Sequence, residues 1–144
     1  MDIIFDIDGT LADCSHRRHF VASKPKNWKA FNAGMEKDTL IKPVAKILDA
    51  LIESHNAIII STGREEIYKD NTIRWLGDNN IFYHALYMRK AGDYRTDDIV
   101  KGEMLDQMIA DGYNPVVAFD DRDRVVKLWR SRGLICAQVA EGSF

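Results

Sequence analysis

The first apolar run of the chain ends in two carboxylates and a glycine, in the stretch Ile3-Ile4-Phe5-Asp6-Ile7-Asp8-Gly9-Thr10. Short runs of β-branched and aromatic residues favour a buried strand. Residues two apart on a strand point to the same side, so the carboxylates of Asp6 and Asp8 are expected to converge where the strand ends. Gly9 allows a sharp turn there, and Thr10 adds a hydroxyl group.

Four further runs of strand length follow along the chain. They are Ala57 to Ile60, Phe82 to Met88, Val116 to Phe119 and Ile135 to Val139. Segments with apolar residues at helical spacings separate these runs. They are Val44 to Ile52 behind Pro43, a weaker one from Glu65 to Asp78, Ile99 to Ile109 before Gly112, and Val125 to Trp129 before Gly133. This alternation predicts an α/β fold: a three-layer α/β/α Rossmann-like parallel sheet of about five strands.

Residues 12–40 do not follow this alternation. Trp28, Phe31 and Met35 indicate one short helix among loops. We expect a small cap-like insertion here rather than a second domain, because 144 residues suffice for one ordinary domain. Residues 1–144 are therefore predicted to form a single domain.

The bulk composition argues against a strongly basic nucleic-acid-binding protein and against a membrane-spanning one. The formal net charge is -2, so the chain lacks a global basic footprint, and any contact with nucleic acid must be local. Asp2 and Asp6 interrupt the first apolar run, so no N-terminal signal sequence is expected. No apolar run is long enough to cross a bilayer. Cys14 and Cys136 are interpreted as reduced thiols, which favours a cytoplasmic protein without membrane contact.

Three more polar clusters accompany the first, and each has an alternative explanation. Ser61-Thr62-Gly63-Arg64 ends the second strand and suits a phosphate cradle, or only a helix-capping turn. Lys101, inside an apolar-periodic helix, either serves a site or is a surface lysine that reaches solvent. Asp120-Asp121-Arg122 ends the fourth strand, where acids also offset a helix dipole. If strand four lies beside strand one, Asp120 comes close to Asp6.

Paired carboxylates indicate a cation. Asp6 and Asp8 repel each other unless positive charge lies between them, and their oxygens suit a hard cation such as Mg²⁺. Taken alone, Asp-x-Asp-Gly is also compatible with a surface turn or part of a calcium loop. Four polar clusters in one short chain favour the catalytic interpretation.

Together these clusters resemble the four motifs of the haloacid dehalogenase superfamily of phosphatases. The run from Asp6 to Thr10 resembles the first motif, Ser61-Thr62 the second, Lys101 the third and Asp120-Asp121 the fourth. The resemblance implies that superfamily's fold with only a small cap, and we expect the strand order 3-2-1-4-5.

Three segments resemble more closely the 3′-phosphatase domain of polynucleotide kinase/3′-phosphatases of the T-even bacteriophage type. They are Thr62 to Glu65, Gly92 to Lys101, and the stretch from Asp120 to Phe144. Arg17 stands where that family has a functional arginine. No Gly-x-x-x-x-Gly-Lys-Ser/Thr loop occurs, so no kinase domain is expected.

The resemblance implies a role for each motif residue. Asp6 would be the nucleophile, Asp8 the general acid and base, and Lys101 a stabiliser of charge on the phosphoryl oxygens. Mg²⁺ would be held by Asp6, Asp8, Asp120 and Asp121. The residues expected to contact or orient the substrate are Thr10, Arg17, Thr62, Gly63, Arg64 and Asp97.

The predicted substrate is a phosphorylated nucleic acid end, DNA or RNA, with removal of a 3′-phosphate. The insertions are too short to seal the site, and basic residues in or near them would form a local cationic rim unless they are scattered solvated charges. These residues are Arg17, Arg18, Lys24, Lys26, Lys29, Arg89, Lys90 and Arg95. The alternatives are a nucleotidase or other small-molecule phosphatase, and a non-catalytic phosphate-binding subunit of an end-healing complex. Kinase or ligase activities would then lie on partner chains.

Overall fold

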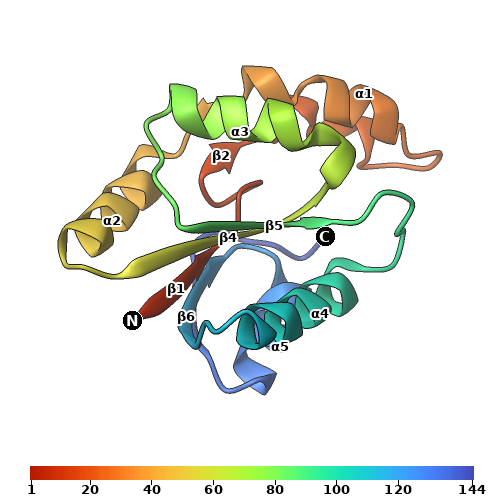
Figure 1. Cartoon of the computed structure of the whole chain (residues 1–144). Coiled ribbons are helices and arrows are strands. Elements are labelled where there is room, and N and C mark those ends of the chain that lie inside the picture. Colours follow the sequence, from red (N-terminus) through yellow and green to blue (C-terminus); the bar gives the residue numbers. More distant parts are fainter.

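A sheet of five parallel strands runs through the centre of the protein (Figure 1), whose computed structural model describes residues 1–144. The strands are β1 Asp2–Phe5, β4 Ala57–Glu65, β5 Ala85–Arg89, β6 Pro115–Asp120 and β7 Ile135–Gln138. Their order across the sheet is β5-β4-β1-β6-β7. This is the predicted order 3-2-1-4-5, so the predicted α/β fold is confirmed. The central strand β1 has β4 and β6 as its neighbours.

Helices cover both faces of the sheet (Figure 1). On one face lie α2 Lys42–Glu53 and α3 Lys69–Asp78, and on the other lie α4 Asp97–Ala110 and α5 Asp123–Ser131. Side chains alternate along β1, so Ile3 and Phe5 pack with α2 and α3, while Ile4 packs with α4 and α5. Each face therefore has its own apolar core, and β1 is buried between them.

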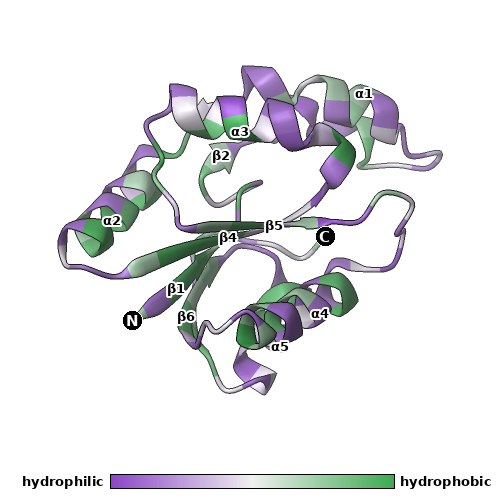
Figure 2. Ribbon diagram, in the orientation of Figure 1, coloured by the Kyte–Doolittle hydropathy of each residue, from purple (hydrophilic) through white to green (hydrophobic).

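Hydropathy follows this layering. Figure 2 shows green, apolar strands enclosed between helices that carry much of the purple, hydrophilic surface. Such amphipathic helices bury one stripe against the sheet and leave the opposite side to water. None of the helices combines the length and the apolar composition needed to cross a bilayer.

The insertion at residues 12–40 contains more structure than the sequence predicted. Its strands β2 Ala12–Asp13 and β3 Thr39–Leu40 pair antiparallel. Between them lie a 3₁₀ helix, Ser15–Phe20, the short helix α1 Trp28–Ala33, and a 3₁₀ turn, Met35–Lys37. The predicted single helix therefore holds Trp28 and Phe31, while Met35 begins a separate turn.

Two strand boundaries also differ from the predicted ones. The apolar run of β4 ends at Ile60, but the extended backbone continues because Glu65 pairs with Arg89 of β5 across an irregular register. The predicted helix start at Glu65 is therefore wrong, and a 3₁₀ turn, Glu66–Tyr68, precedes α3. β5 begins at Ala85 rather than at Phe82, whose side chain is exposed.

Candidate active site

The carboxyl ends of β1 and β6 bring three aspartates together. The N–H of Asp6 donates to the carbonyl of Phe119 over 3.0 Å, which continues the pairing of the two strands. Asp6, Asp120 and Asp121 are all buried, and their carboxylate oxygens lie within 4.8 Å of one another. Thr10 Oγ lies 3.4 Å from Asp6 Oδ2 and also 3.4 Å from Asp121 Oδ1. The expected proximity of Asp120 to Asp6 is thus present.

Lys101 reaches the same point from α4. Its Nζ lies 2.8 Å from Asp6 Oδ1 and 2.9 Å from Asp120 Oδ2, and the side chain is 2% exposed. The alternative of a solvent-reaching surface lysine is therefore wrong. Burial alone would lower the pKa of Lys101, but Asp120 and Asp6 outweigh it and raise that pKa. We call Asp6, Asp120, Asp121 and Lys101 the acidic cluster.

The acidic cluster carries more negative than positive charge. Burial, with Asp120 and Asp121 nearby, raises the pKa of Asp6 even though Lys101 opposes the shift. Burial and Asp120 also raise the pKa of Asp121 to about 6. Asp121 Oδ2 is buried without a hydrogen-bond partner. The three aspartates offer only oxygen ligands, they carry surplus negative charge, and one of their oxygens has no partner. These properties fit a hard divalent cation such as Mg²⁺.

Gly9 closes the turn after Asp8 against this cluster. Its φ is +84°, and a Cβ there would lie 2.1 Å from Asp121 Oδ2. Any other residue would displace the Asp121 carboxylate. The glycine of the first motif is therefore required by a close approach as well as by the turn.

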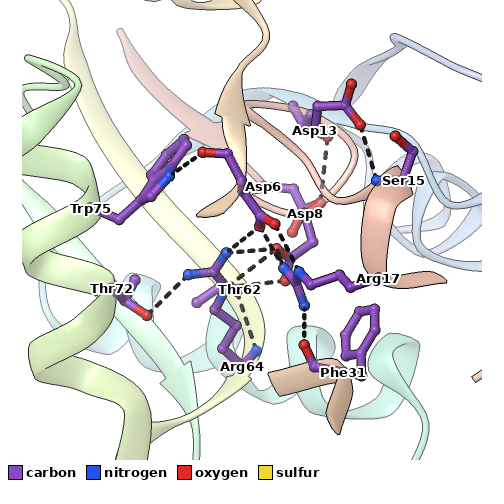
Figure 3. Close-up of polar contacts among 12 residues, drawn as sticks. Asp6, Asp8, Asp13, Ser15, Arg17, Phe31, Thr62, Arg64, Thr72 and Trp75 are labelled. Atoms are coloured by element: carbon purple, nitrogen blue, oxygen red, sulfur yellow. Dashed lines mark hydrogen bonds and ion pairs between the residues drawn. The ribbon is translucent and has the colours of Figure 1, made fainter. Parts of the chain in front are cut away.

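Asp8 points toward two arginines (Figure 3). Arg17 Nη2 and Arg64 Nη2 each lie 2.7 Å from Asp8 Oδ1. Burial would raise the pKa of Asp8, but Arg64 and Arg17 outweigh it and lower the pKa to about 2. Asp8 is thus ionised and fixed in direction, separate from the acidic cluster.

A second carboxylate, which the sequence did not single out, completes this group. Asp38 accepts from Arg17 Nη2 over 2.6 Å and from Arg17 Nε over 2.8 Å, and Arg64 Nη2 lies 3.4 Å away. Its side chain is fully buried. We call Asp8, Asp38, Arg17 and Arg64 the arginine clamp. Two buried arginines facing one carboxylate require a second acid, and that requirement is the signal that could have found Asp38.

The insertion and α3 hold the clamp in place. Arg17 Nη1 donates to the carbonyl of Phe31, and its Cζ lies 4.2 Å from the Phe31 ring centroid. Trp75 of α3 donates from Nε1 to the carbonyl of Asp38 over 2.9 Å. Residues 12–40 therefore serve to build this group, and the short antiparallel pair β2–β3 places Asp38 near the end of β1.

The second predicted cluster, Ser61 to Arg64, lies beside the clamp, but contacts within the protein already occupy most of its polar groups. Thr62 Oγ1 accepts from the N–H of Arg64 over 3.2 Å, and the carbonyl of Gly63 accepts from Arg89 Nε over 2.8 Å. A Cβ at Gly63 would lie 2.6 Å from Asp97 Oδ1. The strand end thus packs directly against Asp97, at the start of α4.

Asp97 links α4 to two arginines. It pairs with Arg89, and it accepts from Arg122 Nη1 over 2.7 Å. Burial opposes ionisation, but Lys101, Arg122 and Arg89 together lower the pKa of Asp97. The positive charge of Lys101 therefore acts on Asp97, although no ion pair or hydrogen bond joins the two side chains.

The cationic rim is smaller than predicted. Arg17 is 1% exposed and Arg89 is also buried, so neither is free to meet a substrate at the surface. Arg95 pairs with Asp93 and Glu103. The rim prediction is wrong for Arg17 and Arg89, because their charges balance buried carboxylates and carbonyls inside the protein.

Comparison with known proteins agrees with this geometry. Residues 1–144 match the family model described as polynucleotide kinase PNKP phosphatase domain. One chain in a structure of the Pnkp1/Rnl/Hen1 RNA repair complex superposes with a TM-score of 0.84 and 34% identity, covering 99% of this chain and 43% of that one. A candidate bifunctional polynucleotide kinase/RNA ligase of Autographa californica nuclear polyhedrosis virus is 28% identical over 130 residues, covering 89% of this chain and 17% of that protein. The chain spans less than half the length of these relatives.

More distant structures share the fold. The haloacid dehalogenase-like hydrolase SP0104 of Streptococcus pneumoniae superposes with a TM-score of 0.68 at 16% identity, covering 95% of this chain and 83% of that one. The resemblance drawn from the four motifs is thereby confirmed. The chain belongs to the polynucleotide kinase PNKP phosphatase-domain family, within the haloacid dehalogenase-type phosphatases.

Proposed function

We propose that this phosphatase is a Mg²⁺-dependent polynucleotide 3′-phosphatase that acts through an aspartyl-phosphate on Asp6. The observation that carries the proposal is the acidic cluster. Lys101 holds one oxygen of Asp6 at 2.8 Å, while Asp121 offers an unpartnered oxygen. A nucleophile, a fixed cation and a metal-ligand oxygen therefore meet at one buried point.

Asp6 would attack the phosphorus while the bond to the 3′ oxygen of the sugar breaks. The leaving oxygen takes a proton from Asp8, which is then free to remove a proton from water. That water attacks the phosphorus of the aspartyl-phosphate, which releases inorganic phosphate and restores the Asp6 carboxylate. The two half-reactions share one acid and base, so Asp8 must keep a fixed direction throughout.

The residues that would hold the ion are Asp6, Asp120 and Asp121, with the backbone carbonyl of Asp8. When bound, Mg²⁺ supplies positive charge that screens the carboxylates from the phosphate. Lys101 and Thr62, together with the N–H of Gly63, would stabilise charge on the phosphoryl oxygens. Thr10 would orient Asp6 and Asp121, the two carboxylates that its hydroxyl already approaches.

The arginine clamp supports a positioning role for Arg17 and Arg64. Each arginine already contacts Asp8 and Asp38. A substrate phosphate would have to compete with both carboxylates for either guanidinium. In the first step Asp8 has to be protonated in order to donate to the leaving oxygen. A substrate phosphate that contacts Arg17 or Arg64 would offset their positive charge and so raise the pKa of Asp8.

Three observations support a nucleic acid end as the substrate. The family model is that of a polynucleotide kinase phosphatase domain, and the relatives are named for polynucleotide kinase, RNA ligase and an RNA repair complex. The insertion over the site is short. Lys24, Lys26 and Lys29 on it remain exposed. We propose an end-healing role in the cytoplasm beside kinase or ligase chains, and the relative from an RNA repair complex supports such partner chains.

The test is a comparison of kcat/KM for an oligonucleotide with a 3′-phosphate, one with a 5′-phosphate, and a 3′-mononucleotide. We expect the first to be best, with an advantage over the mononucleotide that shrinks as salt rises. Equal values for the first and third at low salt would favour a nucleotidase. Full activity in excess chelator would refute the need for Mg²⁺.

A further inference from the structure

The segment 139–144 lies against the loop that carries Asp120 and Asp121. The carbonyl of Gly142 accepts from the N–H of Asp123 over 2.9 Å. A Cβ at Gly142 would lie 1.9 Å from the carbonyl oxygen of Asp121, so only glycine permits this approach. The segment has no regular secondary structure, yet its backbone is fixed beside the acidic cluster. In Figure 1 the end marked C lies between the two helical layers.

This backbone places the ring of Phe144 against two arginines. Cζ of Arg18 lies 4.8 Å and Cζ of Arg122 lies 5.2 Å from the ring centroid. Arg122 Nε also donates to the backbone oxygen of Phe144 over 2.8 Å. The residue is nevertheless 56% exposed. The protein therefore holds an aromatic ring in a defined place at the surface.

Arg18 connects this ring to the acidic cluster. Its Nη2 lies 3.7 Å from Asp121 Oδ2, the oxygen without a hydrogen-bond partner. On another side, Phe144 borders a cavity of about 520 Å³, whose charged lining residues are Arg124, Lys127, Asp98 and Asp123. The ring thus lies between the proposed reaction centre and an open hollow large enough for further parts of a substrate.

We infer that Phe144 is a stacking platform for the terminal nucleobase of a single-stranded 3′-phosphorylated end, an inference that rests on the proposed function. An aromatic ring stacks on any base, because every base has a π-face, and a neighbouring arginine adds a cation–π contribution. A base held there would keep its 3′-phosphate close to Asp6, with Arg18 between the two. What distinguishes Phe144 from other exposed aromatic residues is its fixed place against two arginines, one of which also reaches Asp121.

The test combines binding and kinetics in Phe144→Leu, Phe144→Tyr and wild type. A 3′-phosphate oligonucleotide with 2-aminopurine as its terminal base is bound in chelator, where turnover stops. We expect the wild type and Phe144→Tyr to quench the fluorescence by stacking, and Phe144→Leu to lose most of the quenching. With Mg²⁺, Phe144→Leu should raise KM about tenfold for the ordinary oligonucleotide. It should change KM little for one whose terminal 3′-phosphorylated sugar lacks a base.

The matched control is Phe82→Leu, an exposed aromatic before the start of β5 and so at the opposite edge of the sheet. It should change neither quenching nor KM. Equal losses on the ordinary and abasic substrates would overturn the inference, because they indicate a structural role. Unchanged quenching in Phe144→Leu would overturn it as well. If wild type fails to release phosphate from any oligonucleotide, the proposed function fails first, whatever Phe144 does.

Discussion

The acidic cluster and the arginine clamp meet at the same turn after β1, but their charges are arranged in opposite ways. Asp6 belongs to one group and Asp8, two residues later, to the other. In the acidic cluster three carboxylates share one ammonium group, and an oxygen of Asp121 has no partner. In the arginine clamp two carboxylates face two guanidiniums, each contacting both acids.

This difference predicts which of the two groups binds a cation. Surplus negative charge raises the pKa of Asp6 and Asp121, and such a group gains by binding a cation. Balanced charge lowers the pKa of Asp8 and leaves the clamp without need of a ligand. β1 ends at Phe5 and the backbone bends at Ile7, so the alternation of a strand does not extend to Asp8. The expected convergence of Asp6 and Asp8 is therefore not present, and Asp8 instead pairs with Arg17 and Arg64.

The sharpest way to break the acidic cluster is Asp6→Asn. An amide is a poor nucleophile and a poor metal ligand, so turnover should fall by at least about a thousandfold. Folding should be retained, because the change removes a charge that burial disfavours. Steady-state phosphate release and thermal unfolding are measured together, with Asp49→Asn on α2 as the control. Measurable turnover well above this limit would contradict the nucleophile assignment.

Lys101→Met tests the cation of the same cluster. The variant keeps the length of the side chain but leaves Asp6 and Asp120 without their ammonium partner, so kcat should fall on the order of a hundredfold. Lys46→Met, on the exposed side of α2, should be nearly neutral, changing the free energy of unfolding by less than about 0.5 kcal/mol. A near-normal rate in folded Lys101→Met protein would remove Lys101 from the mechanism.

Breaking the arginine clamp should cost stability as well as rate. Asp38→Ala leaves two buried guanidiniums with one carboxylate, which should lower the free energy of unfolding by about 3 kcal/mol. Because Asp8 then loses its fixed direction, kcat should fall about tenfold even at temperatures where the variant is folded. Urea unfolding and single-turnover rates provide the two readouts.

Glu36→Ala is the matched control for the clamp, since Glu36 lies two residues away and its contacts are exposed: a hydrogen bond from Asn71 Nδ2 over 2.6 Å and a contact of 3.7 Å to Arg74. Its free energy of unfolding should change by less than about 0.5 kcal/mol. A stable Asp38→Ala variant with wild-type rate would show that the clamp does not position Asp8.

The smallest expected effect concerns pH. Burial raises the pKa of Asp121 to about 6 in the folded protein, against about 3.9 in an unfolded chain. The metal-free protein has this contribution to stability in full below about pH 4, and loses it as pH rises through about 6. Mg²⁺ binds the ionised carboxylates, so it should raise Tm by a few degrees more at about pH 7.5 than at about pH 5.

The Mg²⁺ measurement sharpens the comparison between the two groups. Asp121→Asn should lose most of the pH-dependent gain, while Asp38→Asn should keep it, since the clamp is not expected to bind the ion. Calorimetry gives the Tm of each protein with and without Mg²⁺ at the two pH values. A gain that is independent of pH in wild type would contradict the surplus charge described for the acidic cluster.

Residues next to strand ends could be placed from the sequence, because parallel strands direct their carboxyl ends to one edge. The positions of Asp6 and Asp120 followed from that rule together with the strand order. Lys101 lies within α4, and the sequence assigned it to the site only through its resemblance to the third motif. Asp38 could not be placed in the same way. It lies in an insertion without periodicity, and its partners became recognisable only once Arg17 and Arg64 were found buried.

The extension of β4 was missed for a related reason. Thr62, Gly63 and Arg64 are polar, so the apolar pattern ends before the strand does. Their extended conformation depends on the pairing of Glu65 with Arg89, a contact between residues distant in sequence. Tertiary pairing here overrides the local pattern, and the cationic rim was overestimated because buried arginines look the same as exposed ones in a sequence.

The central place of β1 has a consequence for how the protein is made. Phe5 pairs with Ile60 on one side and with Phe119 on the other, so β1 has no complete set of partners until β6 has been synthesised. Such non-local pairing delays the folding of this sheet until residues 115–120 are available. A chain that stalls just after α4 would carry Asp6 and Lys101 but not Asp120, and so would lack a residue that the proposed mechanism requires. Under that mechanism, phosphatase activity appears only after Asp120 and Asp121 have been translated.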